Sequence, residues 1–246
     1  MNYGDVAQAM INRKKPEKTN SNIKILYHGS SDCDIIPDIN KCKRNNDYGP
    51  GFYTTEILDL AKEWAAYRGS YGKCYVNKYE LDISNLKICE FDDSDFLQWL
   101  AVLLSNRQVE EIKNSKSAES NALIDVLMSH KYIDLSNYDC VIGWRADDAY
   151  YEYVTSYVTG EITTETFINS IRKGNLGKQF VLLSKKAFDT IKLVGTEPVN
   201  YSLWDMKSKE RTSRATKAVR LSIESPSGDL FAKRFVDEIR DLVKKG

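Results

Sequence analysis

Residues 46–55 read Asn-Asp-Tyr-Gly-Pro-Gly-Phe-Tyr-Thr-Thr, and this stretch changes from turn residues to strand residues at Gly51. Asn, Asp, Gly and Pro favour turns, whereas Phe, Tyr and Thr favour strands. Between 57 and 65, apolar residues then recur at i, i+3, i+4, i+7 and i+8, which predicts the buried face of a helix. We therefore expect a loop, a short strand over 51–55 and a helix in succession.

A further strand is predicted upstream, over 23–28, where Ile-Lys-Ile-Leu-Tyr-His is rich in strand-forming residues and stops at Gly29. The polar stretch 29–50 between the two strands predicts a long loop, and such loops often carry function. His28 is therefore expected to end one strand, and Tyr53 to lie inside the next.

Downstream, periodicity predicts strands over 74–82, 140–143, 179–184 and 191–194, and helices around 96–104, 120–129, 150–158 and 167–171. Helices and strands mix without a regular βαβ alternation, which favours the α+β class over a doubly wound sheet. We expect an N-terminal helix and linker over 1–22, one main domain over 23–196 and a helical tail over 197–246. An amphipathic helix is predicted near the end of that tail, with four apolar residues on one face: Phe231, Phe235, Ile239 and Leu242.

The composition is that of a soluble globular protein. Of 246 residues, 42% are hydrophobic, and 35 basic residues balance 35 acidic ones. No apolar run reaches the roughly 18 residues that a transmembrane helix needs. The N-terminus has no basic segment ahead of a long apolar stretch, so a cytoplasmic protein without a membrane partner is expected. A generic nucleic-acid binder would carry a basic excess, which the whole chain lacks.

The rarity of metal-binding residue types predicts that no metal is bound. The five cysteines form no Cys-x-x-Cys pair, and only two histidines occur. The sequence also lacks a phosphate-binding P-loop, a Gly-x-Gly-x-x-Gly turn, a His-Glu-x-x-His site and a Gly-x-Ser-x-Gly elbow. Several large enzyme classes are therefore disfavoured together.

Two motifs carry a resemblance to a known family. Tyr27-His-Gly-Ser30, followed by Gly51-Phe-Tyr-Thr-Thr55, resembles the first two motifs of the His-Tyr-Glu class of ADP-ribosyltransferases, which includes diphtheria toxin and the poly-ADP-ribose polymerases. A bacterial family of ADP-ribosyltransferase-like proteins of uncharacterised function is similar over further stretches: 46–55, Ala61-Lys-Glu-Trp-Ala65, Gly143-Trp-Arg-Ala-Asp-Asp148 and Gln179-Phe-Val-Leu-Leu-Ser184. The resemblance covers residues 23–195 and implies a split β-sheet core with flanking helices.

The resemblance also implies that the substrate is NAD and assigns roles around it. His28 would bond a ribose hydroxyl, the backbone of Gly29 would hold the carboxamide, and Tyr53 would stack on the nicotinamide ring. Other residues are expected to line the same dinucleotide site: Ser30, Gly51, Phe52, Arg107, Asp147 and Asp148. Arg107 is either a solvated charge after a helix or a contact to the pyrophosphate.

The third position of the class departs from its usual residue, since Gln179 stands where a Glu is expected. Cleavage of the nicotinamide–ribose bond passes through an oxocarbenium-like state, and a neutral amide cannot supply negative charge or act as a base. This favours transfer of a single ADP-ribose over chain elongation. It also leaves room for another carboxylate, and Asp147 and Asp148 are candidates, although both are also good helix N-caps.

We therefore expect a mono-ADP-ribosyltransferase with His28, Tyr53 and Gln179 as its triad. The acceptor is expected to be a protein first and DNA or RNA second. Bacterial enzymes of this chemistry are often toxins, effectors or defence components, which suggests an inhibitor or antitoxin partner. Two alternatives stay open, namely a catalytically inactive NAD-binding module and an NAD glycohydrolase.

Overall fold

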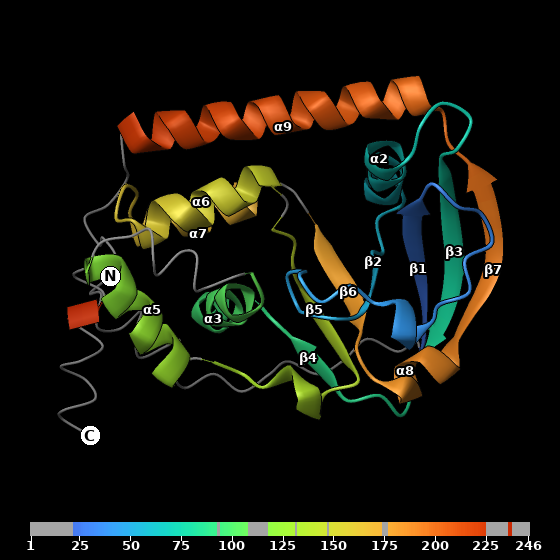
Figure 1. The fold of residues 1–246 in the computed structure, drawn as a ribbon, viewed down its shortest axis with the longest axis horizontal. Helices are drawn as coiled ribbons and strands as arrows, with labels where there is room; N and C mark the ends of the chain where they lie inside the picture. Colours follow the sequence, from blue (N-terminus) through green and yellow to red (C-terminus); the bar gives the residue numbers. More distant parts are fainter. Residues whose placement is uncertain are drawn as a thin grey trace.

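A computed structural model describes residues 22–92, 94–107, 118–130, 132–146, 148–173, 177–224 and 236–237. Two β-sheets lie side by side, and most of the helices gather on the far side of the larger sheet (Figure 1). The smaller sheet has the strand order β1 (Ile23–Ser30), β3 (Tyr75–Asp82) and β7 (Ile191–Pro198). The larger has the order β2 (Phe52–Thr54), β6 (Lys178–Leu182), β5 (Cys140–Trp144) and β4 (Ile88–Glu90). This mixture of sheets and helices confirms the predicted α+β class.

The two sheets meet where β1 and β2 run past each other. Tyr27 and Thr55 form an isolated antiparallel bridge, with backbone N–H···O distances of 2.8 and 3.0 Å. On its other side β2 pairs with β6, so Tyr53 lies opposite Val181. The bridge therefore brings the end of β1, with His28, beside the strand that carries Tyr53.

Helix α2 (Leu58–Arg68) packs directly on β1, and Gly29 makes this possible. A Cβ atom on Gly29 would overlap the carbonyl oxygen of Ala61 and the amide nitrogen of Ala65. Both alanines are fully buried. The close approach requires small residues on both elements, and it fixes the position of α2 relative to His28.

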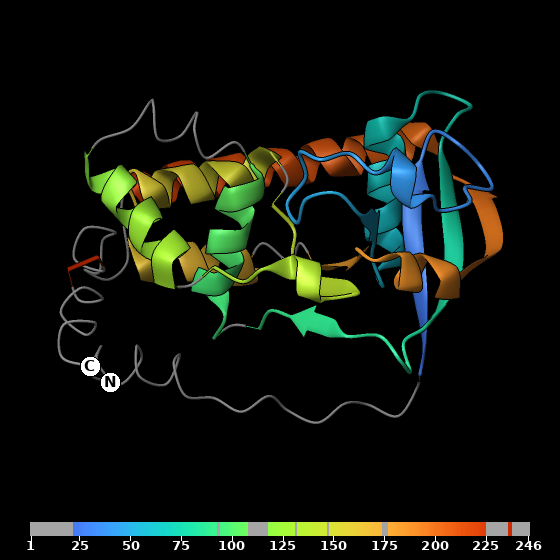
Figure 2. The same ribbon diagram turned by 60° about the horizontal axis from the view of Figure 1, so that its bottom comes forward.

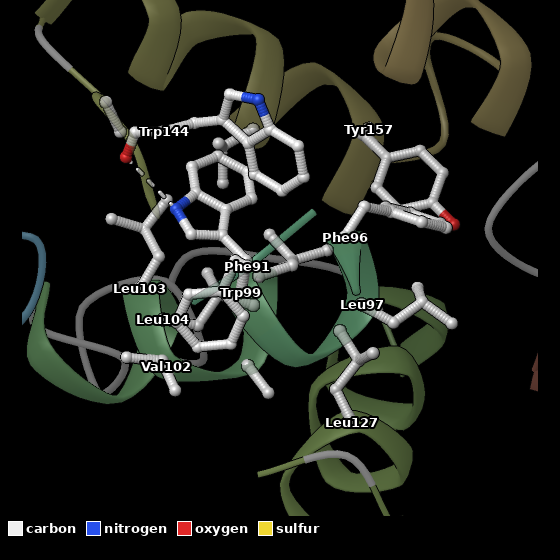
Figure 3. Packing of buried hydrophobic residues seen from close by; sticks show 14 of the residues in the cluster. Phe91, Phe96, Leu97, Trp99, Val102, Leu103, Leu104, Leu127, Trp144 and Tyr157 are labelled. Atoms are coloured by element: carbon white, nitrogen blue, oxygen red, sulfur yellow. Dashed lines mark hydrogen bonds between the residues drawn. The ribbon is translucent and has the colours of Figure 1, made fainter. Parts of the chain in front are cut away.

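The largest core lies between the four-stranded sheet and the helices α3 (Phe96–Asn106), α5 (Ala118–His130), α6 (Asp148–Val158) and α7 (Thr164–Lys173). Trp99 is at its centre, edge-on to Trp144 with ring centroids 5.6 Å apart (Figure 3). Phe167 stacks against both Trp99 and Tyr157. Burial of large apolar side chains contributes roughly 1.5–3 kcal/mol each, so this cluster is a major source of stability.

Helix α9 (Tyr201–Glu224) follows the last strand and crosses the molecule from α2 to α6 and α7 (Figure 2). Shorter elements complete the fold, namely the 3-10 helices η1 (Ile39–Lys41) and η2 (Leu135–Asn137) and the helix α8 (Lys185–Thr190). Within the described ranges, no helix is both long and apolar enough to cross a membrane.

Most predicted elements are present, with shifted ends. The strand predictions correspond to β1, β2, β3, β5, β6 and β7, and the helix predictions to α2, α3, α5, α6 and α7. Strand β4 and helix α8 were not predicted, and α9 was predicted only as part of a helical tail over 197–246, without its bounds. The predicted N-terminal helix and linker, except for residue 22, lie outside the described residues, as do Phe231, Phe235, Ile239 and Leu242.

Candidate functional site

His28 lies at the end of β1 and is bonded to the backbone of β2. Its Nδ1 atom lies 2.7 Å from the carbonyl oxygen of Tyr53. A carbonyl only accepts, so Nδ1 carries the proton and Nε2 keeps its lone pair in the neutral ring. Burial lowers the pKa of His28 to about 4, and the nearby Arg68 charge adds to this effect. His28 is therefore neutral at pH 7 and offers one hydrogen-bond acceptor.

The hydroxyl of Tyr53 is fully engaged by the loop that precedes β2. It donates to the carbonyl oxygen of Gly49 at 2.7 Å and accepts from the backbone N–H of Tyr48 at 3.0 Å. Burial also raises the pKa of Tyr53 well above its ordinary value. The phenol is thus unsuited to proton transfer, and the aromatic ring is the part of Tyr53 that a ligand can contact.

Gln179 opens the buried part of β6 and is paired with a carboxylate that the sequence analysis did not select. Its Nε2 atom donates to Oδ2 of Asp47 at 3.0 Å. Asp47 also accepts from the backbone N–H of Ala146 and, through Oδ1, from Nε and Nη2 of Arg107 at 2.9 and 2.6 Å. Burial raises the pKa of Asp47, and the Arg107 guanidinium opposes that rise. Four donors on two oxygens fit an ionised carboxylate.

This pairing fixes the orientation of the Gln179 amide. A carboxylate can only accept, so the NH₂ group faces Asp47 and Oε1 faces away from it. Gln179 is only 5% exposed, and its Oε1 has no hydrogen-bond partner among the described residues. A buried acceptor left without a partner costs about 1–3 kcal/mol. Oε1 is therefore poised to receive a donor from a ligand.

Three of these side chains meet at a cavity of about 220 Å³. Tyr53, Asp47 and Gln179 line it from the two strands and the preceding loop. The remaining lining residues come from α2, from the ends of α3 and β5, and from α9: Trp64, Tyr67, Arg68, Arg107, Arg145, Ala146, Ser208 and Thr212, with Asn46 from the loop. Across the described part of the chain, no group of three or more metal-binding side chains occurs.

Several predicted site residues lie elsewhere. His28 does not line the cavity, but its ring is hydrogen-bonded to the backbone carbonyl of Tyr53, which does. The side of Gly29 that a Cβ would occupy is filled by α2, and the Ser30 hydroxyl accepts from the backbone N–H of Asp32. Gly51 lies tightly against Val181 and Leu182. Phe52 is buried in the smaller core, with its ring 4.8 Å from that of His28.

Three charged residues were expected to line the dinucleotide site, and the structure describes only one of them in full. Arg107 lines the cavity, but it does so as the ion-pair partner of Asp47, at 2.6 Å. Its guanidinium also lies over the ring of Tyr151, at 5.6 Å. Asp147 lies outside the described residues. Asp148 is the first residue of α6, and its side chain is likewise outside the description.

Sequence reasoning missed Asp47 and the α9 residues for different reasons. Asp47 is inside the quoted motif stretch, but an Asp in a Gly- and Pro-rich segment is an ordinary turn residue. Its neighbours along the chain give no sign of Gln179, which is 132 positions away. Ser208 and Thr212 lie in a helix with little apolar periodicity, so nothing pointed to the face they share.

Residues 24–193 match the family described as a protein of unknown function, DUF3990. No curated protein and no solved structure matches the chain. The matched range starts in β1 and ends in β7, so it includes both sheets together with His28, Tyr53, Asp47 and Gln179. Helix α9 lies beyond it.

Proposed function

The chain belongs to the DUF3990 family, and we propose that it is an NAD-dependent mono-ADP-ribosyltransferase that acts on a macromolecular acceptor. One observation carries the proposal. Tyr53 and Gln179 line a single cavity, and the His28 ring is bonded to the Tyr53 carbonyl. The three motif positions come from three separate strands, so only the fold brings them together. The resemblance noted in the sequence gives the chemistry that such a group would perform.

In this proposal, His28 and Tyr53 hold the nicotinamide riboside half of NAD. The neutral His28 ring accepts a hydrogen bond from a ribose hydroxyl at Nε2. Its hydrogen bond to the Tyr53 carbonyl keeps the ring in a fixed orientation. The Tyr53 hydroxyl is held by Gly49 and Tyr48, so the ring has a fixed plane for stacking on nicotinamide. Both groups bind and orient the substrate without exchanging protons with it.

Gln179 would bond the hydroxyl of the nicotinamide ribose through Oε1. Asp47 holds the amide in the orientation that makes this bond available, and its charge polarises the amide. Arg107 compensates much of the Asp47 charge, so we assign Asp47 a positioning role. The expectation that Asp147 or Asp148 supplies a second carboxylate stays a prediction, because the side chains of both lie outside the description. The leaving nicotinamide needs little proton chemistry, which fits a site whose titratable groups stay fixed in one state.

The test uses NAD labelled in its adenylate part, added with the purified chain to a cell extract. The His28→Ala/Tyr53→Ala double variant removes the proposed contacts, and Tyr71→Ala serves as a control because Tyr71 is 86% exposed and outside the cavity. Thermal unfolding of each variant checks that it folds.

Label on a macromolecular fraction with the wild type and Tyr71→Ala, lost in the double variant, is the expected result. That fraction also names the acceptor class, protein or nucleic acid. Label ending as free ADP-ribose would replace the proposal with NAD hydrolysis. Label remaining in intact NAD would replace it with a catalytically inactive binding module.

A further inference from the structure

Helix α9 is fixed to the body of the protein at two points on one face. Trp204 is 8% exposed and packs in a cluster with Ala65 and Val76 from α2 and β3. Ala215 is also buried, in the large core, and its carbonyl oxygen accepts from the hydroxyl of Tyr153 at 3.5 Å. Positions 204 and 215 are about three turns apart, so they lie on the same face of the helix.

Between these two anchors the same face is polar. Ser208 and Thr212 follow Trp204 at i+4 and i+8, and both line the cavity. Arg211, at i+7, pairs with Glu63 of α2 at 2.6 Å. A helix that only covered a core would keep apolar residues along this stripe. The stripe is instead apolar where it meets the two cores and polar where it crosses the cavity.

The described lining of the cavity is rich in positively charged groups. Among the described residues, the lining has three guanidinium groups, from Arg68, Arg107 and Arg145, and one carboxylate, that of Asp47. Arg107 is held by that carboxylate. Arg68 is the last residue of α2, and Arg145 follows β5, where its guanidinium lies 5.0 Å from the centre of the Trp64 ring. This cation–π contact with Trp64 helps to hold the Arg145 group in place, and guanidinium groups match the oxygens of phosphate.

The two α9 hydroxyls differ in what they can offer. The hydroxyl of Thr212 is already used within the helix, because its Oγ1 donates to the backbone carbonyl of Ser208, one turn earlier, at 3.0 Å. The Ser208 hydroxyl makes no hydrogen bond to any described residue. Ser208 therefore has a proton available for an oxygen of a bound anion.

We propose that Arg68, Arg145 and Ser208 form a binding site for the phosphate groups of a nucleotide, and that α9 is one wall of that site. The identification of the nucleotide as NAD rests on the proposed function, but the anion site follows from charge and geometry alone. Helix α9 lies beyond the residues that match the family, so this wall is outside the matched range.

The test measures calorimetric binding of ADP-ribose and of inorganic diphosphate to the full chain. The variants are Arg68→Gln, Arg145→Gln and Ser208→Ala. The matched controls are Arg214→Gln and Ser213→Ala, which make the same chemical changes at exposed positions of α9 outside the cavity. Thermal unfolding is compared for all five.

Both arginine variants should weaken ADP-ribose binding by about tenfold or more, since charge-assisted hydrogen bonds are the stronger kind. Ser208→Ala should weaken it by about threefold to tenfold, as expected for one neutral hydrogen bond. Diphosphate should compete with ADP-ribose, and the controls should bind like the wild type. Added salt should weaken binding, most in the wild type.

Equal affinities for the wild type and the three cavity variants would overturn the site, as would a failure of diphosphate to compete. These results are separable from the proposed function. Variant-sensitive ADP-ribose binding without any NAD turnover would keep the phosphate site and reject the transferase. NAD turnover with a KM that none of the three substitutions changes would keep the transferase and reject the phosphate site.

Discussion

Gln179 and Asp47 are joined by a 3.0 Å hydrogen bond from the amide Nε2 to the carboxylate Oδ2, although they are 132 positions apart in the chain. The bond links the buried strand β6 to the loop before β2. It turns Gln179 Oε1 away from Asp47, where it has no partner among the described residues. The proposed substrate contact at Gln179 therefore depends on a residue from the loop.

Asp47→Asn should destabilise the protein by about 1–3 kcal/mol, because an amide cannot accept from all four donors and leaves a partly buried Arg107 without its ion-pair partner. The measurement is the free energy of unfolding in urea. Asp189→Asn is the control, since Asp189 forms an exposed pair with Lys185 and its loss should cost under about 0.5 kcal/mol. Equal effects of the two substitutions would contradict the structure around Asp47.

Gln179→Glu should make stability strongly dependent on pH. A second carboxylate beside buried Asp47 repels it, so the folded-state pKa of the pair rises above the unfolded values. The variant should therefore be most destabilised near pH 8 and recover toward the wild-type stability as the pH falls to 5. Urea unfolding of both proteins across this range gives the difference. A difference that does not change with pH would show that the two side chains are not neighbours.

His28 should contribute a stability that is lost in acid. Its folded pKa is about 4 against an ordinary 6.5, so between these values the unfolded chain binds a proton that the folded protein excludes. The wild type should lose roughly 3 kcal/mol from this group as the pH falls from about 7 to 4. His28→Gln should lack this contribution, because Gln does not titrate. The test is the pH dependence of the difference in unfolding free energy, and parallel curves would refute a buried neutral histidine.

Gly29→Ala should be the most damaging single-methyl change in the smaller sheet. The new Cβ would overlap the backbone of α2 at Ala61 and Ala65, which cannot move as a flexible side chain does. Such overpacking costs about 1–3 kcal/mol or more. Gly195→Ala in β7 is the matched control, because its Cβ would meet nothing within 4 Å. The two melting temperatures should differ clearly, and similar values would argue against the close packing of α2 on β1.

The elements with strong periodicity could be predicted from the sequence. The buried residues of α2, Leu60, Ala61, Trp64 and Ala65, recur with helical spacing, and β1 is rich in strand-forming residues. In contrast, β4 has three residues and α8 has six, too few for a period to emerge. A helical tail could be predicted over 197–246, but the bounds of α9 could not, because the stripe between Trp204 and Ala215 is polar. That polar stripe is also what places α9 against the cavity.

Within the candidate site, only the residues that belong to short sequence motifs could be predicted. His28, Tyr53 and Gln179 could be selected because their motifs occur in the expected order along the chain. Asp47 has a side-chain type that any turn would accept, and its partners Arg107, Ala146 and Gln179 come from three distant segments. Such a network depends on tertiary contacts, so periodicity and local turn chemistry cannot reveal it.

The most direct test of the central claim measures nicotinamide released from NAD by the full chain in cell extract, with Tyr53→Ala and Tyr71→Ala in parallel. We predict release by the wild type and Tyr71→Ala, and a loss of about 100-fold in Tyr53→Ala. Tyr53→Ala removes the ring from the cavity, whereas Tyr71→Ala removes only an exposed ring outside it. Release at the same rate by folded Tyr53→Ala, or no release by the wild type above the extract alone, would contradict it.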